Sequence, residues 1–500
     1  SEIISINTTP ILYSDDSRIV LSSRNLDLPF LEKYAVCLAG IQNGDTQKFV
    51  RQFWEISNWR KRWWPLQGTS DISCNYAGLN MVIDYDMNEG HLRESKEIRR
   101  KKLHDSDQRG NKAWFKDAIA ISLLGGLKST IYKGWLLDQS AAVILPNENK
   151  YLLPILTFTQ SLEFNHEVRK IDKKRNVTNA TLGKVPFDLE YWQEVAAEKY
   201  PNGLPKPYSD DPTQWLFHGH PIKSETPLQV ALARLLGYRW PAENDTEMEL
   251  ADEAHELIVA VKVFDYLSDA DGIFCIPSVN SEQGGAERLR DYLQQVFASE
   301  WGSKTISQLL LKEGAKSTNL DAWLRDEFFA QHCKVFNNRP FIWHIWDGRK
   351  DGFSALLNYH KLSRENLSKL IYTYLGDWIR MCEAKKKAGE SGAEGLLSAA
   401  LMLKDKLEFI LEGEAPYDIF VRWKTLEQQP IGWDPDLNDG VRLNIRPFVK
   451  AGVLRNRINV KWGVDRGKNP PGSPWGEKRD NDVHLTLEEK RKAKVNAGKS

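Results

Sequence analysis

The chain has 500 residues, which is more than one hydrophobic core normally supports, so we expect two or three domains. Hydrophobic residues make up 41% and charged residues 27%, and this balance indicates globular domains and excludes an intrinsically disordered chain. Lys and Arg together number 68, as do Asp and Glu, so the net charge alone indicates no partner. The apolar runs, such as 141–145 and 272–277, are too short to span a bilayer, so no membrane partner is expected.

Cellular location is indicated by the N-terminus and by the cysteines. The first ten residues, SEIISINTTP, lack the basic start and apolar stretch of a secretion signal. The five cysteines lie far apart in the sequence, without a CxxC pair: Cys37, Cys74, Cys275, Cys333 and Cys382. Such spacing is typical of free thiols in a reducing compartment, so we expect a cytoplasmic protein without disulfides or structural zinc.

The first 187 residues mix short apolar runs with turns. The runs at 80–87, 135–146 and 152–159 predict strands or short buried helices between Gly, Asn and Asp breaks. The polar stretch 88–113 predicts a mobile surface loop or a charged helix. Basic clusters stand at 96–102 (KEIRRKK) and 168–175 (VRKIDKKR), and most clusters of this kind are simply solvated surface.

The second part of the chain is predicted to be mainly helical. Apolar residues recur at helical spacing, and the predicted helices cover 226–238, 249–267, 285–299, 319–336, 363–387 and 394–413. We therefore predict an α+β protein, in which a mixed α/β domain precedes a mainly α-helical C-terminal region. The predicted boundaries are 1–187 for the first domain, 188–225 for a proline-rich linker, 226–465 for the helical domain and 466–500 for a polar, irregular tail.

Three motifs that could carry chemistry have simpler interpretations. LLGGLKST at 123–130 resembles a phosphate-binding loop, but Leu127 breaks the required Gly-Lys spacing, so no nucleotide triphosphate site is expected. His218 and His220 have no third ligand at a suitable spacing and predict a loop turn, not a metal site. His344 lies in an apolar, tryptophan-rich stretch and is expected in the core. We predict no catalytic and no metal-binding residue.

The segment GIQNGDTQKFVRQFWEI at 40–56 resembles the start of the target-recognition domains of large adenine-specific (N6) DNA methyltransferases. These proteins occur in restriction-modification systems and in the phage-defence systems BREX and DISARM. Their G-x-x-x-G-[DN] turn leads into [FL]-[LVI]-R-x-x-W-E, which here is matched by Gly40, Gly44, Asp45, Phe49, Val50, Arg51, Trp54 and Glu55. The stretch 64–68 (WPLQG) is similar to the W-x-P segment that follows, although the usual Lys-Gly-Gly is absent, and 114–146 and 178–187 resemble the domain core and its closing segment.

The later half resembles the long methyltransferases of this group, such as that of DISARM. The resembling stretches are 215–221, 235–241, 269–277, 324–353, 416–448 and 459–468, so the resemblance covers nearly the whole chain. In that family the catalytic domain precedes this region. The resemblance therefore implies that Ser1 marks a fragment boundary or the start of a split subunit.

Catalysis by this group requires a glycine-rich turn for S-adenosylmethionine and an Asp/Asn-Pro-Pro-aromatic motif whose ring stacks on the extruded adenine. Asn469, Pro470 and Pro471 are followed by Gly472, which has no stacking surface, and we interpret them as a turn. No cofactor-binding residue is therefore predicted in this chain. The resemblance implies that S-adenosylmethionine is bound by a separate catalytic half, either a domain or a subunit.

As a recognition region, the chain is expected to contact phosphates through basic clusters and base edges through amides, lysine or hydroxyls. Cations that alternate with tryptophans also suit a backbone groove or an unstacked base. The predicted DNA-binding residues are Arg51, Arg60, Arg62, Trp63, Trp64, Arg99, Arg100, Lys101, Lys128, Ser129, Lys173, Lys174, Arg175, Asn176 and Asn179. An equal alternative for Trp54, Trp63 and Trp64 is packing in a hydrophobic core.

The functional hypothesis is DNA binding and target recognition for adenine-N6 methylation in a bacterial restriction or anti-phage system. The expected partners are duplex DNA, the methyltransferase catalytic domain or subunit, and other defence-system proteins. The main alternative is a non-enzymatic scaffold that binds only proteins within a defence complex. A further alternative is RNA binding through the segments in which aromatic and basic residues alternate.

Overall fold

The computed structural model describes residues 28–93, 105–279 and 281–498. The chain forms two compact units that are discontinuous in sequence. Unit 1 comprises Ser1–Asn43, Trp64–Met81 and Tyr85–Pro207, and unit 2 comprises Gly44–Trp63, Val82–Asp84 and Tyr208–Ser500. The chain therefore passes between the units at five points. The predicted α+β class is confirmed, with helices concentrated in the later region.

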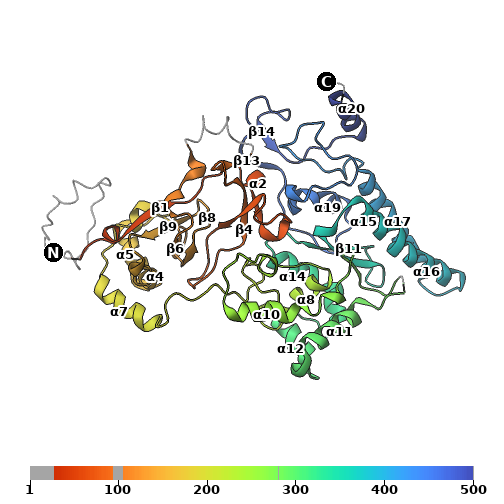
Figure 1. Cartoon of the computed structure of the whole chain (residues 1–500). Coiled ribbons are helices and arrows are strands. Elements are labelled where there is room, and N and C mark those ends of the chain that lie inside the picture. Colours follow the sequence, from red (N-terminus) through yellow and green to blue (C-terminus); the bar gives the residue numbers. More distant parts are fainter. Residues whose placement is uncertain (1–27, 94–104, 280, 499–500) are drawn as a thin grey trace, which may run out of the picture. The chain divides into compact units, whose positions relative to one another are not determined.

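A four-stranded antiparallel sheet organises unit 1 (Figure 1). Its strand order is β1-β9-β6-β7, formed by β1 (Ala35–Ala39), β9 (Ala141–Pro146), β6 (Asp117–Ser122) and β7 (Ser129–Lys133). β6 and β7 are the arms of a hairpin, with Ile121 opposite Ser129 next to its loop. Helix α4 (Leu152–Thr159) packs on β6 and β7. The apolar run 152–159, predicted as either strand or helix, is therefore a buried helix.

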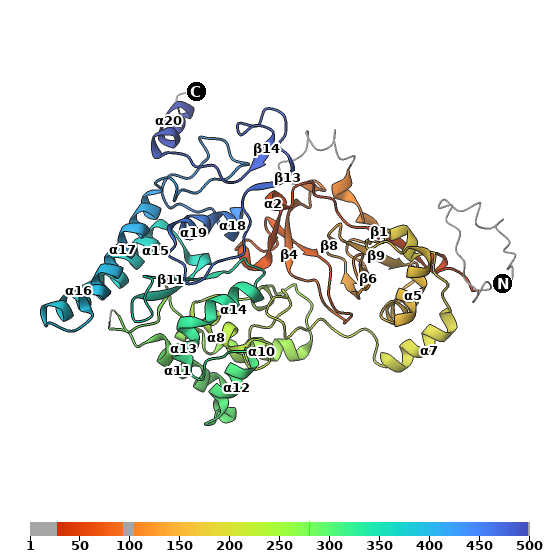
Figure 2. The ribbon, with the colours of Figure 1, turned by 180° about the vertical axis from the view of Figure 1, so that it is seen from behind.

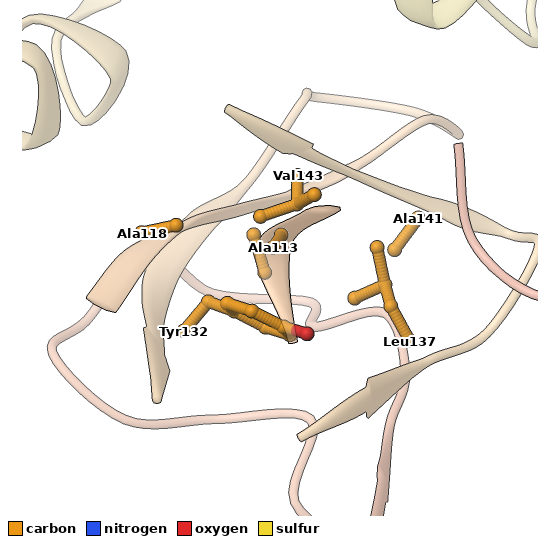
Figure 3. Close-up of a cluster of buried hydrophobic side chains, with 7 residues drawn as sticks. Ala113, Ala118, Tyr132, Leu137, Ala141 and Val143 are labelled. Carbon is orange, nitrogen blue, oxygen red and sulfur yellow. The ribbon is translucent and has the colours of Figure 1, made fainter. Parts of the chain in front are cut away.

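Small residues in this sheet leave room for one large ring (Figure 3). Ala118, Ala141 and Val143 pack with Leu137 and Tyr132, and all of these side chains are buried. The same cluster includes Ala113, which precedes β6 in the chain. The Tyr132 hydroxyl donates to the carbonyl oxygen of Trp135, so its polar atom is satisfied inside the core. The segment that leads into β6 is thereby anchored to the sheet.

The other elements of unit 1 are short strands and three further helices. They are β5 (His91–Leu92), β8 (Leu136–Leu137), α5 (Leu162–Ile171), α6 (Asn179–Leu182) and α7 (Leu189–Lys199). α7 lies within the predicted linker 188–225, but it packs on α4, where the ring of Trp192 is 5.3 Å from that of Phe158. Strands β3 (Trp63–Gln67) and β4 (Met81–Asp86) run from one unit into the other. In unit 1, β3 pairs in parallel with β8, and β4 pairs with β5.

Unit 2 contains a three-stranded antiparallel sheet inside a region that was predicted to be mainly helical. The order is β10-β12-β11, with β10 (Ile273–Cys275), β12 (Ser354–Asn358) and β11 (Ile342–Trp346). β-branched and aromatic side chains favour the extended chain in β11, whose sequence is IWHIW. Both faces of β11 and β12 are buried, so neither strand shows the polar-apolar alternation of a half-exposed strand.

Helices precede β10, separate β10 from β11 and follow β12 in the sequence. Of these helices, α16 and α17 lie side by side (Figure 2). The helices of unit 2 are α2 (Thr46–Phe49), α8 (Pro227–Leu235), α9 (Pro241–Asn244), α10 (Asp252–Lys262), α11 (Gly285–Phe297), α12 (Thr305–Lys312), α13 (Leu320–Asp326), α14 (Phe328–Val335), α15 (Arg364–Lys369), α16 (Gly376–Lys387), α17 (Ala393–Glu412), α18 (Val441–Asn444), α19 (Arg446–Ala451) and α20 (Leu487–Ala497). The remaining strands are β2 (Val50–Gln52), β13 (Val464–Lys468) and β14 (Lys478–Asp480). All six predicted helical ranges contain helix.

Two ranges differ from the sequence-based prediction. The range 319–336 is two helices, because the chain departs from helical geometry at Glu327, whose carboxylate accepts the Lys316 and Ser317 backbone amides. The tail predicted as irregular contains the β13–β14 hairpin and α20. α20 starts with a capping box, in which Thr486 and Glu489 satisfy each other's backbone amides. Within the described residues, no helix is both long enough and apolar enough to cross a bilayer.

Candidate nucleic-acid interface

The β6–β7 hairpin presents a glycine-rich loop, 123–128, which is the part of the sequence that resembles a phosphate-binding loop. The Ser122 amide donates to the Lys128 carbonyl oxygen at 2.8 Å and closes the loop. Gly125 has φ +69°, a conformation that favours glycine. A Cβ on Gly126 would lie 3.3 Å from Cε of Lys128, so the lysine stem passes over this glycine. Leu127 is buried, whereas 124–126 is exposed.

Helix α5 holds this loop from one side. Asn165 Nδ2 donates to the Gly126 carbonyl oxygen at 2.7 Å. Arg169 Nη2 donates to the Gly125 carbonyl oxygen at 2.6 Å, and its Nη1 donates to the carbonyl oxygen of Lys174. A single guanidinium therefore links the hairpin loop to a second loop, 172–178, which follows α5. A forked side chain is suited to such a double contact.

The second loop carries the predicted basic cluster next to the hairpin loop. Leu124 and Asn176 form an antiparallel bridge, and the Val177 amide donates to the Leu123 carbonyl oxygen at 3.1 Å. All four side chains from Lys173 to Asn176 are exposed. The structure thus brings the predicted residues Lys128, Lys173, Lys174, Arg175 and Asn176 into two adjoining loops of unit 1. The only carboxylate in these two loops, that of Asp172, is buried.

A third loop, 69–75, adjoins the same hairpin and was missed by the sequence analysis. The Ser70 amide donates to Ser122 Oγ at 2.8 Å, and Ser122 Oγ donates back to the Ser70 carbonyl oxygen at 3.1 Å. Ser73 Oγ accepts the Ser129 amide at 3.3 Å. The only sequence signal for this loop was its position after the W-x-P stretch. We call the surface of loops 69–75, 123–128 and 172–178 the three-loop surface.

Two predicted base-contacting residues have internal roles in unit 1. The Ser129 side chain is fully buried in β7. Asn179 is half-buried at the start of α6, and its Nδ2 donates to the Cys37 carbonyl oxygen at 3.1 Å. Their contact with DNA stays a prediction. The predicted residues Arg99, Arg100 and Lys101 lie outside the described residues.

The motif around Arg51 forms an internal joint of unit 2. Arg51 is buried, with its guanidinium carbon 5.3 Å from the Trp63 ring centroid and 5.5 Å from that of Trp423. Its Nε donates to the Asn438 carbonyl oxygen at 3.1 Å. Burial lowers the pKa of Arg51 from its ordinary value, although Glu55 and other acidic groups oppose this shift.

Trp54 and Glu55 complete this joint. Trp54 Nε1 donates to the Arg339 carbonyl oxygen at 2.9 Å, and Glu55 Oε1 accepts the Val441 amide at 2.9 Å. The motif therefore holds segments of unit 2 that are 285 and 386 residues away in the chain. No pattern within 40–56 could have identified these partners.

The remaining aromatic and basic candidates of this region are also engaged. Arg60 Nε lies 2.7 Å from an oxygen of Asp245, and Arg62 Nη2 lies 2.7 Å from one of Asp84, all within unit 2. Trp63 is fully buried and its Nε1 donates to Asn438 Oδ1, which agrees with the core alternative for this residue. Trp64, the first residue of the next segment of unit 1, is half-buried. DNA contact by Arg51, Arg60, Arg62, Trp63 and Trp64 stays a prediction.

The histidine motifs are part of the packed interior of unit 2. His218 Nδ1 accepts the His220 amide at 3.0 Å, and His220 Nδ1 accepts the Ile222 amide at 3.2 Å, so these rings brace a turn. Burial lowers the pKa of both to about 4. His344 is fully buried in β11. Among the residues that the structure describes, no group of His, Cys, Asp and Glu side chains could hold a metal ion.

The described geometry thus defines a small α+β unit with a three-loop surface that is rich in exposed cations and has an amide on it. No protein-family model matches the chain. Part of the chain is similar to a curated protein, the adenine-specific methyltransferase PglX of Lacticaseibacillus casei (strain Zhang), with 33% identity over 93 residues. The match covers 18% of this chain and 8% of that protein, so only a small part of the relative is represented here.

Proposed function

We propose that this chain recognises duplex DNA as the target-recognition region of an adenine-N6 DNA methyltransferase system. The system would serve restriction or defence against phage, as the sequence resemblance implies. In this proposal, a separate domain or subunit binds S-adenosylmethionine and transfers the methyl group. The partial similarity to an adenine-specific methyltransferase supports this assignment.

The observation that carries the proposal is the three-loop surface. Lys128, Lys173, Lys174 and Arg175 bring four cations onto adjoining loops, and cations on loops suit the phosphates of a duplex. Asn176 is exposed next to Arg175, and a carboxamide can bond an adenine edge in the major groove through two hydrogen bonds. The contacts of Arg169 and Asn165 hold the loops in place before binding, which lowers the entropic cost of recognition.

The test is a fluorescence-anisotropy titration of a labelled duplex with the full chain at several salt concentrations. If four phosphates are neutralised, the logarithmic salt slope is about −3.6, and affinity falls on the order of a hundredfold between about 50 and 200 mM salt. An affinity that does not change over this range would contradict duplex recognition. In that case, binding to defence-system proteins without DNA would favour the scaffold alternative.

A separate experiment tests whether this chain recognises DNA while a separate catalytic half transfers the methyl group. Methyl transfer from tritiated S-adenosylmethionine to DNA is measured for the chain, for a separate catalytic half, and for both together. We expect little transfer by either alone and a large increase together, because DNA held by this chain reacts as if tethered to the catalytic site. Methylation by residues 1–500 alone would overturn the division.

A further inference from the structure

Phe115 is an exposed aromatic ring in unit 1 that the proposed function does not use. Phe115 is 74% exposed, and its backbone has φ +62°, which is uncommon for a residue other than glycine. Exposed strain of this kind persists only where the surrounding structure enforces it, and it is concentrated at functional sites. The question is what holds Phe115 in this position and what it could bind.

The turn that carries Phe115 is fixed on both sides. The Phe115 amide donates to the Gly134 carbonyl oxygen at 2.9 Å, and the Lys116 amide donates to the Ala113 carbonyl oxygen at 3.1 Å. Gly134 has φ +80°, and a Cβ there would lie 2.4 Å from Cα of Phe115, so only glycine allows this close approach.

Neighbouring side chains anchor the same turn. Ala113 is buried with Ala118 and Tyr132 in the core of the sheet (Figure 3). The Trp114 ring packs edge-on against Tyr85, with 5.8 Å between centroids. The two residues that precede Phe115 therefore make inward contacts, while its own ring is left in solvent. A ring presented on a fixed turn loses little freedom when it binds.

The surroundings of the ring are cationic. Arg109, Lys112 and Lys116 are exposed in the same segment, and none of them forms an ion pair within the part of the chain that the structure describes. The nearest carboxylate in sequence, Asp117, is already paired with Lys133, with 3.0 Å between Oδ1 and Nζ. An isolated ring among cations differs from the apolar patch of a protein interface and matches the combination used on nucleic acids, where rings stack on bases and cations contact phosphates.

The position of Phe115 fits one duplex that also contacts the three-loop surface. Phe115 precedes β6, and loop 123–128 follows it, so the two lie at opposite ends of this strand. Six residues of strand span about 20 Å at about 3.4 Å per residue. One turn of B-form DNA is about 34 Å long, so a single duplex reaches both ends within one turn.

We propose that Phe115 is a base-stacking residue, whose ring packs against an unstacked base of bound DNA while Arg109, Lys112 and Lys116 contact the flanking phosphates. The inference rests on the proposed function and adds a second contact region to it. The ligand is a base exposed by local opening of the duplex. Apolar side chains inserted between base steps of this kind are a recurrent means of opening or bending DNA.

The test compares the full chain with Phe115→Ala and Phe115→Trp on a paired duplex and on the same duplex with a single mismatch, which lowers the cost of unstacking. We expect Phe115→Ala to weaken binding to the mismatched duplex by roughly tenfold, with a smaller loss on the paired one, and Phe115→Trp to retain binding. The salt slope should not change, because no charge is removed. Tyr266→Ala is the matched control, since Tyr266 in unit 2 is also 74% exposed.

A 2-aminopurine base, moved stepwise along the duplex, reports where a base loses its stacking on neighbouring bases. We expect one position to brighten when the unaltered chain binds and to stay dim with Phe115→Ala. If the unaltered chain binds DNA but Phe115→Ala matches it in both assays, the inference is wrong and the proposed function stands. If Phe115→Ala keeps DNA binding but loses a methyltransferase partner, the ring docks a protein and the inference is equally wrong. No binding of the unaltered chain to either duplex would overturn both.

Discussion

Unit 1 and unit 2 use their cations in opposite ways. In unit 2 the Arg234 side chain is 1% exposed and lies 2.8 Å from Glu243 and 2.7 Å from Asp265. In unit 1 the side chains of Lys173, Lys174 and Arg175 are exposed, and within the described residues they form no ion pair. The first arrangement stabilises a fold, and the second leaves positive charge free for a ligand.

Other buried cations of unit 2 repeat the first arrangement. Arg422 lies 2.6 Å from Asp45 and 3.1 Å from Asp465, and Asp465 also accepts from Arg442 at 2.9 Å. A residue count that gives equal numbers of acids and bases therefore conceals an uneven distribution of available charge. What indicates a nucleic-acid interface is the number of cations that remain unpaired at the surface, which composition does not report.

The largest expected contrast between the units is their response to acid. Burial lowers the pKa of five histidines of unit 2, to about 4 for His218, His220 and His360 and to about 3 for His332 and His344. Because the unfolded chain binds these protons first, stability is lost as the pH falls below about 6.5, by about 2 kcal/mol per histidine at about pH 5.

Carboxyls of unit 2 whose pKa is raised by burial oppose this loss; they are Glu225, Asp269, Glu313, Asp347 and Asp439. Burial raises the pKa of Glu313 to about 7 and that of Asp269 to about 6, so folding takes up their protons and gains stability as the pH falls. The five histidines outweigh these carboxyls, because only Glu313 and Asp269 have comparably large pKa shifts, and we expect a net loss on the order of several kcal/mol. Urea unfolding at about pH 7.5 and 5 measures it, and amide hydrogen exchange locates it. Earlier loss of protection in unit 1 would contradict the contrast.

The next largest effect is expected from Arg234→Ala. This change leaves the buried Glu243 carboxylate without its cation, and breaking a buried pair in this way costs about 3–5 kcal/mol of unfolding free energy. Urea unfolding monitored by tryptophan fluorescence measures the loss. The control is Arg349→Ala, which removes a surface pair with Asp351 and should leave the unfolding midpoint unchanged. Equal midpoints for the two variants would show that the buried pair is not structural.

A smaller effect, on DNA binding and not on stability, is expected from joint replacement of Lys173, Lys174 and Arg175 by Ala. Three lost phosphate contacts flatten the logarithmic salt slope by about 2.7 and weaken binding to all sequences alike. Joint replacement of Lys385, Lys386 and Lys387 in α16 removes the same charge from unit 2 and serves as the control. If both triple variants lose the same slope, the two units do not differ in their DNA contacts.

The smallest effect is expected from Arg169→Lys, which keeps the charge but replaces the forked guanidinium that bonds both loops with a single ammonium group. The lost carbonyl contact loosens the three-loop surface, so preference for the target sequence over others should fall roughly fivefold with an unchanged salt slope. Lys170→Arg is the charge-preserving control on the same helix, where Lys170 pairs with Glu167. A competition titration between target and unrelated duplexes gives the ratio. Unchanged preference would show that Arg169 does not position the loops for recognition.

Helices and exposed loops of this protein could be predicted from sequence because their signals are local. Apolar spacing predicted a helix at 394–413, and α17 covers Ala393–Glu412. The cluster of Lys173, Lys174 and Arg175 was predicted to be available, and these side chains are exposed. A charged side chain that stays in solvent needs no partner elsewhere in the chain, so the local sequence is sufficient to predict that it is exposed.

Features that depend on distant partners could not be predicted. β11 and β12 are short and buried on both faces, so an apolar run of that length is equally compatible with a buried helix. An arginine close to tryptophans in the sequence is compatible with a DNA-binding groove and with a buried packing site. Only the contacts of Arg51 with Trp423 and Asn438 show that its site is buried. Similarly, the alignment of loop 69–75 with Ser122 arises from folding and has no trace in either segment.

Under the proposed function, the five passages of the chain between the units restrict how a new DNA specificity could evolve. Gly44–Trp63 belongs to unit 2, although segments of unit 1 precede and follow it. A recombination event that exchanged residues 1–187 as a block would also exchange Gly44–Trp63 and Val82–Asp84, which fold as part of unit 2 and pack against its later segments. Replacement of a whole region is therefore disadvantaged, because it disturbs the packing between Gly44–Trp63 and the later segments of unit 2. Substitutions within the exposed loops, which leave these joints intact, are the more accessible evolutionary route to a new target sequence.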